Sequence, residues 1–363
     1  MLLDPRDWSL ASRSDEVIAG LVPELRDRVT PETHAAVMEV TTGVHHRVAD
    51  AVAELAELRC QLSRALAGHG LRAGVAGMHP TAVGSDTVVS SHARYRAIGA
   101  SMRVLARREP TLATHVHVGI ADPRAAVRLL NRLRVHLPLL LALSANSPFW
   151  QGRATGFAST RTTVFDAFPR TGVARAFRDY ADWVGRVDAL LRSGAIADPS
   201  LLWWDARLQP RYGTVEVRIM DAQTTVADVG AVAALVQSLA LCELERPDTP
   251  EGGPTANELI EENRFLAARD GMQALLIASG GRIAAVDQLD EVLAACRPWA
   301  DVLGCGRELE AVRRLGACNG AARQVAHAHG RDLRAVTAQL ARAYAADMPM
   351  EADEDVGAAR RAA

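Results

Sequence analysis

The chain has 363 residues, of which 49% are hydrophobic and 23% are charged, as is typical of a folded globular protein. Its net charge of −2 offers no bulk positive charge for nucleic acid or an anionic membrane. The 41 positions counted as lysine or arginine are all arginine, so a phosphate-binding role that lysine often fills falls to arginine side chains here. The five cysteines form no Cys-x-x-Cys pair, which argues against a zinc ribbon or disulfide framework and favours the cytoplasm.

The first part of the chain predicts short strands and amphipathic helices. The N-terminal residues lack the basic segment of a signal peptide. Alternating residues predict a strand over 37–41, with Glu39 on the face opposite its apolar neighbours. Apolar residues at steps of three and four predict a helix over 44–67, and a strand over 71–76 and a helix over 92–108 follow.

A strand with two histidines on one face is predicted next. Residues 114–120 place His115 and His117 on one face and aliphatic side chains on the other. Asp122, followed by proline, is typical of a helix N-terminus. The richest apolar run, 137–145, is about half the length of a membrane-spanning helix, so no membrane partner is expected.

The middle of the chain contains a long segment without periodicity, residues 147–172. Its aromatic side chains indicate that it is ordered, and long ordered loops are often functional. A helix over 173–192 and a strand at 203–205 are predicted after it. A further strand over 213–221 would carry Glu216 on its polar face, with aliphatic side chains on the other.

The last third of the chain predicts helices. Residues 226–346 read as helical, with breaks near 247–256 and at 278–282. The tail, 347–363, is acidic and then rich in alanine and arginine, and we expect it to be disordered. Strands surrounded and followed by helices predict an α+β fold, with one domain over residues 1–346.

The polar faces of these strands indicate a site for a metal and an anion. Glu216 and Arg218 suit phosphoryl transfer, because a carboxylate holds a divalent cation while a guanidinium binds phosphate oxygens. Asp205 and Arg207 repeat the same acid-x-base spacing on the preceding strand. Glu216 with the two histidines of 114–120 would instead suit Zn²⁺ in a metal-dependent hydrolase. A solvated strand face gives the same alternation and stays open as an alternative for each strand taken alone.

Five stretches, in the same order along the chain, resemble the type 2 glutamate–cysteine ligases, the bacterial carboxylate–amine ligases. They are HVHVG (115–119), LSANSPFWQG (143–152), GFASTR (156–161), WWDARLQPRYGTVEVRIMD (203–221) and ENRFLAARDG (262–271). The resemblance implies a glutamine-synthetase-like α+β fold whose antiparallel sheet lines the active site. It also implies an ATP-dependent reaction with Mg²⁺ or Mn²⁺ that joins the γ-carboxylate of glutamate to the amine of cysteine through an acyl phosphate.

The resemblance assigns roles to single positions of this chain. It implies metal ligands at Glu39, His117 and Glu216. It implies that Arg218 contacts the ATP phosphates. We therefore take Arg218 and Glu216 as the catalytic pair, and the repeated acid-x-base spacing adds Arg207 as a second ATP-binding residue. The resemblance places Ser144, Asn146 and Arg161 beside the substrates.

One departure from the family bears on activity. The family carries an acidic strand, of the form Gly-x-Glu-x-Glu or three consecutive glutamates, just ahead of the stretch matching residues 2–5. The sequence here starts after that point, so we expect a weak ligase, with Glu32 as a third carboxylate. The alternatives are a catalytically impaired ligase-like binding protein and the metal-dependent hydrolase. The expected partners are an amino-acid carboxylate and an amine, with a homodimer as a candidate assembly and no nucleic acid.

Overall fold

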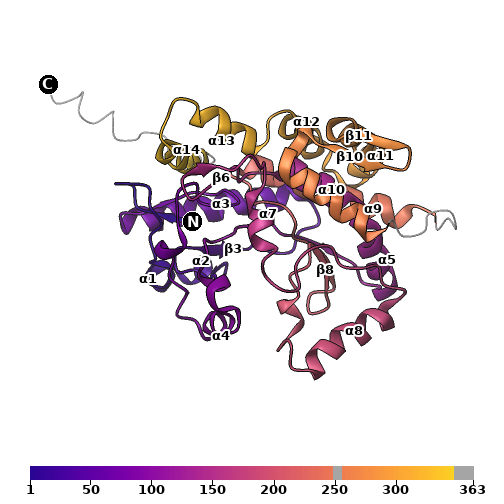
Figure 1. The fold of residues 1–363 in the computed structure, drawn as a ribbon, viewed down its shortest axis with the longest axis horizontal. Coiled ribbons are helices and arrows are strands. Elements are labelled where there is room, and N and C mark those ends of the chain that lie inside the picture. The colour runs from indigo at the N-terminus through magenta and orange to yellow at the C-terminus, as the bar shows by residue number, and fades with distance from the viewer. Residues whose placement is uncertain (248–255, 347–363) are drawn as a thin grey trace.

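The computed structural model describes residues 1–247 and 256–346. Strands and helices are mixed in the first two-thirds of the chain, and helices dominate the last third (Figure 1). The predicted α+β class is therefore confirmed. The predicted disordered tail lies outside the described residues, as does most of the predicted helix break near 247–256.

The secondary-structure elements have the following bounds. The strands are β1 (Leu2–Leu3), β2 (Val29–Pro31), β3 (Met38–Val40), β4 (Arg72–Ala73), β5 (Val116–Gly119), β6 (Phe149–Trp150), β7 (Arg153–Ala154), β8 (Ala206–Gln209), β9 (Thr214–Val217), β10 (Leu275–Ala278) and β11 (Gly281–Ala284). The α-helices are α1 (Ser14–Gly20), α2 (Pro23–Arg26), α3 (Val48–Gly68), α4 (Ala93–Met102), α5 (Pro123–Leu133), α6 (Leu137–Ser144), α7 (Thr160–Phe165), α8 (Tyr180–Arg192), α9 (Val226–Glu245), α10 (Asn257–Asp270), α11 (Ala285–Leu303), α12 (Gly306–Ala317), α13 (Gly320–Ala328) and α14 (Leu333–Ala345). Short 3-10 turns include η2 (Arg103–Arg107) and η4 (Pro199–Leu201).

A three-stranded antiparallel sheet, in the order β5-β9-β8, forms the floor of the polar region. Its apolar face carries Val215, Val217 and Leu208, which are buried in the main core against α5 and α9. In Figure 1 the label β8 marks this sheet, with α9 above it in the view and α8 below it. Because side chains alternate along a strand, burial of the valines turns Glu216 to the opposite face.

Helix α9 crosses the core. It is the one helix in the described ranges that is long and apolar enough, by length and composition, to cross a membrane. The sequence reading found no run of that length, and α9 corrects it. However, 67% of its most apolar window is buried inside the protein, and core helices of soluble proteins pass the same test.

Several predicted elements are confirmed. The structure contains the strand around Glu39, the histidine strand and the Glu216 strand. Asp122 caps α5 by accepting hydrogen bonds from the backbone N–H groups of Arg124 and Ala125.

Others are wrong or were missed. The strand predicted at 203–205 is absent, because this segment has no regular structure and β8 begins only at Ala206. The helix predicted from residue 173 begins at Tyr180. The break predicted at 278–282 is the turn of a hairpin, β10–β11, which local sequence did not reveal inside a helical region.

Candidate active site

Strand register brings three predicted site residues together. Glu216, on the central strand β9, lies directly opposite His117 of β5 and Arg207 of β8. These positions are 99, 9 and 90 residues apart in pairs, so only the antiparallel pairing makes them neighbours. Glu216 and Arg207 are buried, at 2% and 7% exposure, whereas the His117 side chain is 36% exposed.

Glu216 is held by two arginines. Arg207 Nε donates a hydrogen bond of 2.7 Å to Glu216 Oε2, and Arg218 Nη1 donates to Oε1. His115 Nδ1 and His117 Nε2 lie 3.6 Å and 3.7 Å from the same Oε1. Burial alone would raise the pKa of Glu216, but Arg218, His115 and Arg207 together lower that pKa to about 2. The carboxylate is therefore ionised at any physiological pH.

Both histidines are neutral in this setting. Burial lowers the pKa of His115 well below 6.5, and the charge of Arg218 lowers it further. Burial also lowers the pKa of His117. Arg218 Nη1 lies 3.4 Å from His115 Nδ1, which fits a neutral ring that accepts on this nitrogen. His117 Nδ1 lies 2.9 Å from Thr214 Oγ1, a contact that fixes the ring and leaves Nε2 toward Glu216.

A second acidic group faces the same region. Glu39 is paired with Thr30 in the β2–β3 hairpin, and Glu32 follows β2 directly. Burial raises the pKa of Glu39, Glu32 raises it further, and Arg218 opposes the shift, which places the hairpin within reach of the sheet's polar face. Among the described residues, no side chain donates a hydrogen bond or an ion pair to the Glu39 carboxylate.

The oxygen atoms of the site suit a hard cation at Glu39 and Glu32 but not at Glu216. Glu39 and Glu32 supply oxygen ligands of the kind Mg²⁺ prefers, and a cation there would relieve their mutual repulsion. Glu216, by contrast, already has both oxygens engaged by arginine. Within residues 1–247 and 256–346, no group of three or more His, Cys, Asp or Glu side chains is arranged around one point as a metal requires. The predicted set Glu39, His117 and Glu216 is thus not a preassembled ligand cage, and its metal-binding role stays a prediction.

Arg161 supports the backbone that presents Arg218. Its Nη1 donates to Ile219 O at 2.9 Å and its Nη2 to Arg218 O at 3.3 Å. The side chain is buried, at 6% exposure, and lies 3.7 Å from Asp221. The observed geometry is that of a positioning residue, and its predicted contact with substrate stays a prediction.

Asp221 was missed by the sequence reading. It is fully buried and accepts hydrogen bonds from Asn146 N at 2.8 Å, Ser147 Oγ at 2.7 Å and Ser159 Oγ at 2.8 Å. It therefore ties two loop segments to the end of β9. The sequence offered one signal, an aspartate directly after the apolar pair at 219–220. A carboxylate buried with such neighbours needs hydrogen-bond donors around it.

Ser144 and Asn146 make internal contacts. Ser144 Oγ donates to Leu140 O at 2.7 Å within α6. Asn146 Nδ2 donates to Ala222 O at 2.7 Å, and its Oδ1 accepts from Gln324 Nε2 at 2.7 Å. Both residues are 0% exposed, so the structure shows them shaping the loop, and their predicted substrate contact stays a prediction.

The acid-x-base repeat of Asp205 and Arg207 does not form a second polar site like that of Glu216 and Arg218. Asp205 accepts a hydrogen bond of 2.5 Å from Arg264 Nε and so pairs away from Arg207. Arg207 Nη1 donates to Ser200 O and Leu202 O at 2.8 Å and 2.6 Å. Arg207 therefore anchors Glu216 to the η4 turn, and its predicted contact with ATP stays a prediction.

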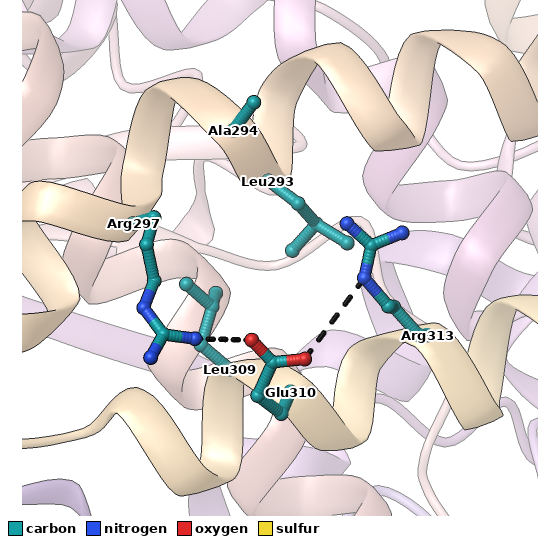
Figure 2. A pocket seen from close by; sticks show the side chains of 6 residues that line it. All are labelled: Leu293, Ala294, Arg297, Leu309, Glu310 and Arg313. Carbon is teal, nitrogen blue, oxygen red and sulfur yellow. Dashed lines mark hydrogen bonds and ion pairs between the residues drawn. The ribbon is translucent and has the colours of Figure 1, made fainter.

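A small pocket of about 140 Å³ lies elsewhere, between α11 and α12 (Figure 2). Its charged side chains satisfy one another, since Glu310 pairs with both Arg297 and Arg313. None of the residues around Glu216 lines it, so it is not the site described above.

Comparison with known proteins identifies the family. The Glutamate-cysteine ligase family 2 profile matches residues 1–342. The chain belongs to this family. It is therefore an enzyme of the glutamate–cysteine ligase type. A protein of Rubrobacter xylanophilus named "Putative glutamate–cysteine ligase 2-1" is 37% identical over 316 residues, covering 86% of this chain and 84% of that protein. A Sorangium cellulosum protein named "Putative glutamate–cysteine ligase 2" is 39% identical over 295 residues, covering 80% of this chain and 78% of that protein.

A solved structure shows the same fold. The glutamate–cysteine ligase of Francisella tularensis, solved in complex with AMP, aligns with a TM-score of 0.66. The alignment covers 97% of this chain and 88% of the other at 13% identity, a likeness that establishes fold alone. The α+β architecture expected from the sequence is confirmed, and it is the fold of a glutamate–cysteine ligase.

Proposed function

We propose that this ligase uses ATP to couple the γ-carboxylate of glutamate to the amine of cysteine, giving γ-glutamylcysteine, ADP and phosphate. The observation that carries the proposal is the pair of arginines, Arg207 and Arg218, locked around Glu216 beside the acidic hairpin of Glu39 and Glu32. The two arginines suit the phosphates of a triphosphate, and the two glutamates of the hairpin suit the divalent cation that accompanies it.

The chain's own residues act by positioning and by charge. Arg218 would bind phosphate oxygens during transfer of the γ-phosphoryl group to the carboxylate, because Glu216 holds its guanidinium and Arg161 holds its backbone. Glu39 and Glu32 would hold the Mg²⁺ or Mn²⁺, which supplies charge neutralisation to the phosphates. The amine then attacks the acyl phosphate, and phosphate leaves.

We expect turnover to be weak. A triphosphate with divalent cations needs several free carboxylates, and Glu216 is already neutralised by two arginines. Glu39 and Glu32 then have to hold the metal without a third carboxylate from Glu216. The reaction is expected in the cytoplasm on small-molecule substrates, and light scattering would test whether the protein is a homodimer.

The test is ADP release with Mg²⁺ or Mn²⁺ across pairs of amino acids, with mass spectrometry of the products. ADP release that requires both glutamate and cysteine, together with γ-glutamylcysteine, is expected. Nucleotide binding without ADP release from any pair would favour the impaired, ligase-like binding protein. Bound zinc near one equivalent, with hydrolysis independent of ATP, would favour the metal-dependent hydrolase.

A further inference from the structure

Helix α4 runs between two parts of the polar region, the β2–β3 hairpin and the η4 turn, without belonging to the core. None of its ten residues is buried, which is unusual for a helix held by tertiary packing. At its C-terminal end Arg103 adopts φ 53°, a conformation that non-glycine residues rarely take. The chain bends there into η2, where Ala106 is fully buried. The helix is thus joined to the body of the protein through a bend at Arg103.

One side of α4 contacts the acidic hairpin. Tyr95 donates its hydroxyl to Pro31 O at 2.8 Å and lies 3.4 Å from Glu32 Oε1. Burial and the charges of Glu32 and Glu39 raise the pKa of Tyr95, so its hydroxyl stays protonated and remains a donor. The helix therefore begins on the side of the site where we place the cation.

The other side of α4 contacts the sheet side of the site. Arg94 Nη2 donates to Ser200 Oγ at 2.6 Å, and Arg94 Nη1 lies 3.6 Å from Asp198 Oδ2. Ser200 O also accepts from Arg207, the arginine that holds Glu216. We call the contacts of Arg94 with Ser200 and Asp198 the Arg94 bridge. The Arg94 bridge therefore links α4 to Ser200, whose carbonyl oxygen binds the arginine that holds Glu216.

We propose that α4 is a closing element over the active site and that the Arg94 bridge holds it shut, which makes Arg94 a positioning residue for ligation. This inference rests on the proposed function. An acyl phosphate must react with an amine before water reaches it, so a cover that excludes water raises the yield of ligation. The bridge is partly exposed, at 43% for Arg94 and 46% for Asp198, and pairs of this kind are weak. Such a bridge can open for substrate entry and close again.

The test compares Arg94→Gln with a matched control, Arg313→Gln. Arg313 is an exposed arginine on α12 that pairs with Asp290 and Glu310, outside the site. We first measure hydrogen exchange of the backbone amides of 93–102 without any ligand. Arg94→Gln should speed this exchange by about two- to fivefold, the range that one exposed ion pair sustains, and Arg313→Gln should leave it unchanged.

The second readout is the ratio of ADP released to γ-glutamylcysteine formed. Loss of the bridge should raise this ratio by about two- to fivefold as water intercepts the acyl phosphate, and Arg94→Lys should restore part of the coupling. Unchanged exchange over 93–102 in Arg94→Gln overturns the closing role, and so does faster exchange with an unchanged ratio. If the wild-type protein releases no ADP with any amino acid, the proposed function fails, and the exchange measurement alone decides whether Arg94 holds α4 closed.

Discussion

Arg207 and Glu216 face each other across β8 and β9, and both side chains are buried in a hydrogen-bonded pair of 2.7 Å between Nε and Oε2. Arg207 is in turn held by the η4 backbone, so the pair fixes the carboxylate that orients Arg218. Glu216 therefore stabilises the sheet and, in the proposed mechanism, also orients Arg218 for turnover. A change at this position should affect stability as well as turnover.

Glu216→Gln should destabilise the protein by about 3 to 5 kcal/mol, because it leaves the buried Arg207 guanidinium and the half-buried Arg218 guanidinium without their carboxylate. It should also abolish ADP release, since Arg218 loses the group that orients it. Urea unfolding and an ADP assay measure the two effects. Glu310→Gln is the control, because Glu310 also lies between two arginines but at the surface, and it should change stability by less than about 0.5 kcal/mol. Equal losses in both variants would show that burial of the Glu216 pair has no special weight.

The stability of the protein should fall in two steps as the pH is lowered. Burial lowers the pKa values of His115 and His117 in the folded protein. As the pH drops below 6.5, the unfolded chain therefore binds protons at these histidines more readily than the folded protein does, and stability falls. Glu216 has a pKa of about 2 against an ordinary 4.5, so its contribution is complete above 4.5 and is lost as pH falls toward 2. Urea unfolding at a series of pH values measures both stages. A wild type and Glu216→Gln that lose stability in parallel below pH 4.5 would contradict the assignment of the second stage.

Glu39→Gln should make the protein more stable but less active. Burial and Glu32 raise the pKa of Glu39, so its ionisation opposes folding increasingly as pH rises above 4.5. Glutamine removes that cost and also removes the oxygen ligand we assign to the cation. We expect a higher melting temperature at neutral pH together with a loss of about two orders of magnitude in ADP release. A variant that is both more stable and fully active would remove Glu39 from the cation site.

His117→Ala should damage metal-dependent nucleotide binding more than His115→Ala. His117 is the more exposed of the two, and its Nε2 faces Glu216 Oε1 while Thr214 holds the other nitrogen. His115 instead packs against the Arg218 guanidinium. Calorimetric titration with Mg²⁺–ATP compares the two variants. Equal losses, especially with bound zinc in the wild type, would support a two-histidine metal site.

Gly320→Ala should lower stability by about 1 to 3 kcal/mol through overpacking. A Cβ on Gly320 would fall 2.0 Å from Asn146 Oδ1, in the loop network around Asp221. Gly185→Ala is the control, because Gly185 lies within α8 with nothing within 4 Å of the added carbon, and alanine there should stabilise the helix by about 1 kcal/mol. Thermal unfolding of both variants gives the comparison, and a neutral Gly320→Ala would mean that the loop around Asn146 yields easily.

The sequence alone predicted the strands that carry the site, because residue alternation is a local property. The aliphatic residues of 114–120 and 213–221 had to face a core, which left His117 and Glu216 on the polar face. The motifs along the chain likewise indicated the family before any geometry was known.

Partners of the polar groups were decided by tertiary structure. Glu216 has two arginines as partners, Asp205 pairs with Arg264 rather than with the β8 face, and Asp221 gathers two loops in the interior. The sequence reading assigned Ser144, Asn146 and Arg161 to the substrates, whereas the structure engages each of them with backbone or buried side chains. Spacing along a strand fixes which face a side chain takes, but hydrogen-bond partners depend on strand register and on segments up to 178 residues away, as in the contact of Asn146 with Gln324. That information is absent from any local pattern and appears only when the chain is folded.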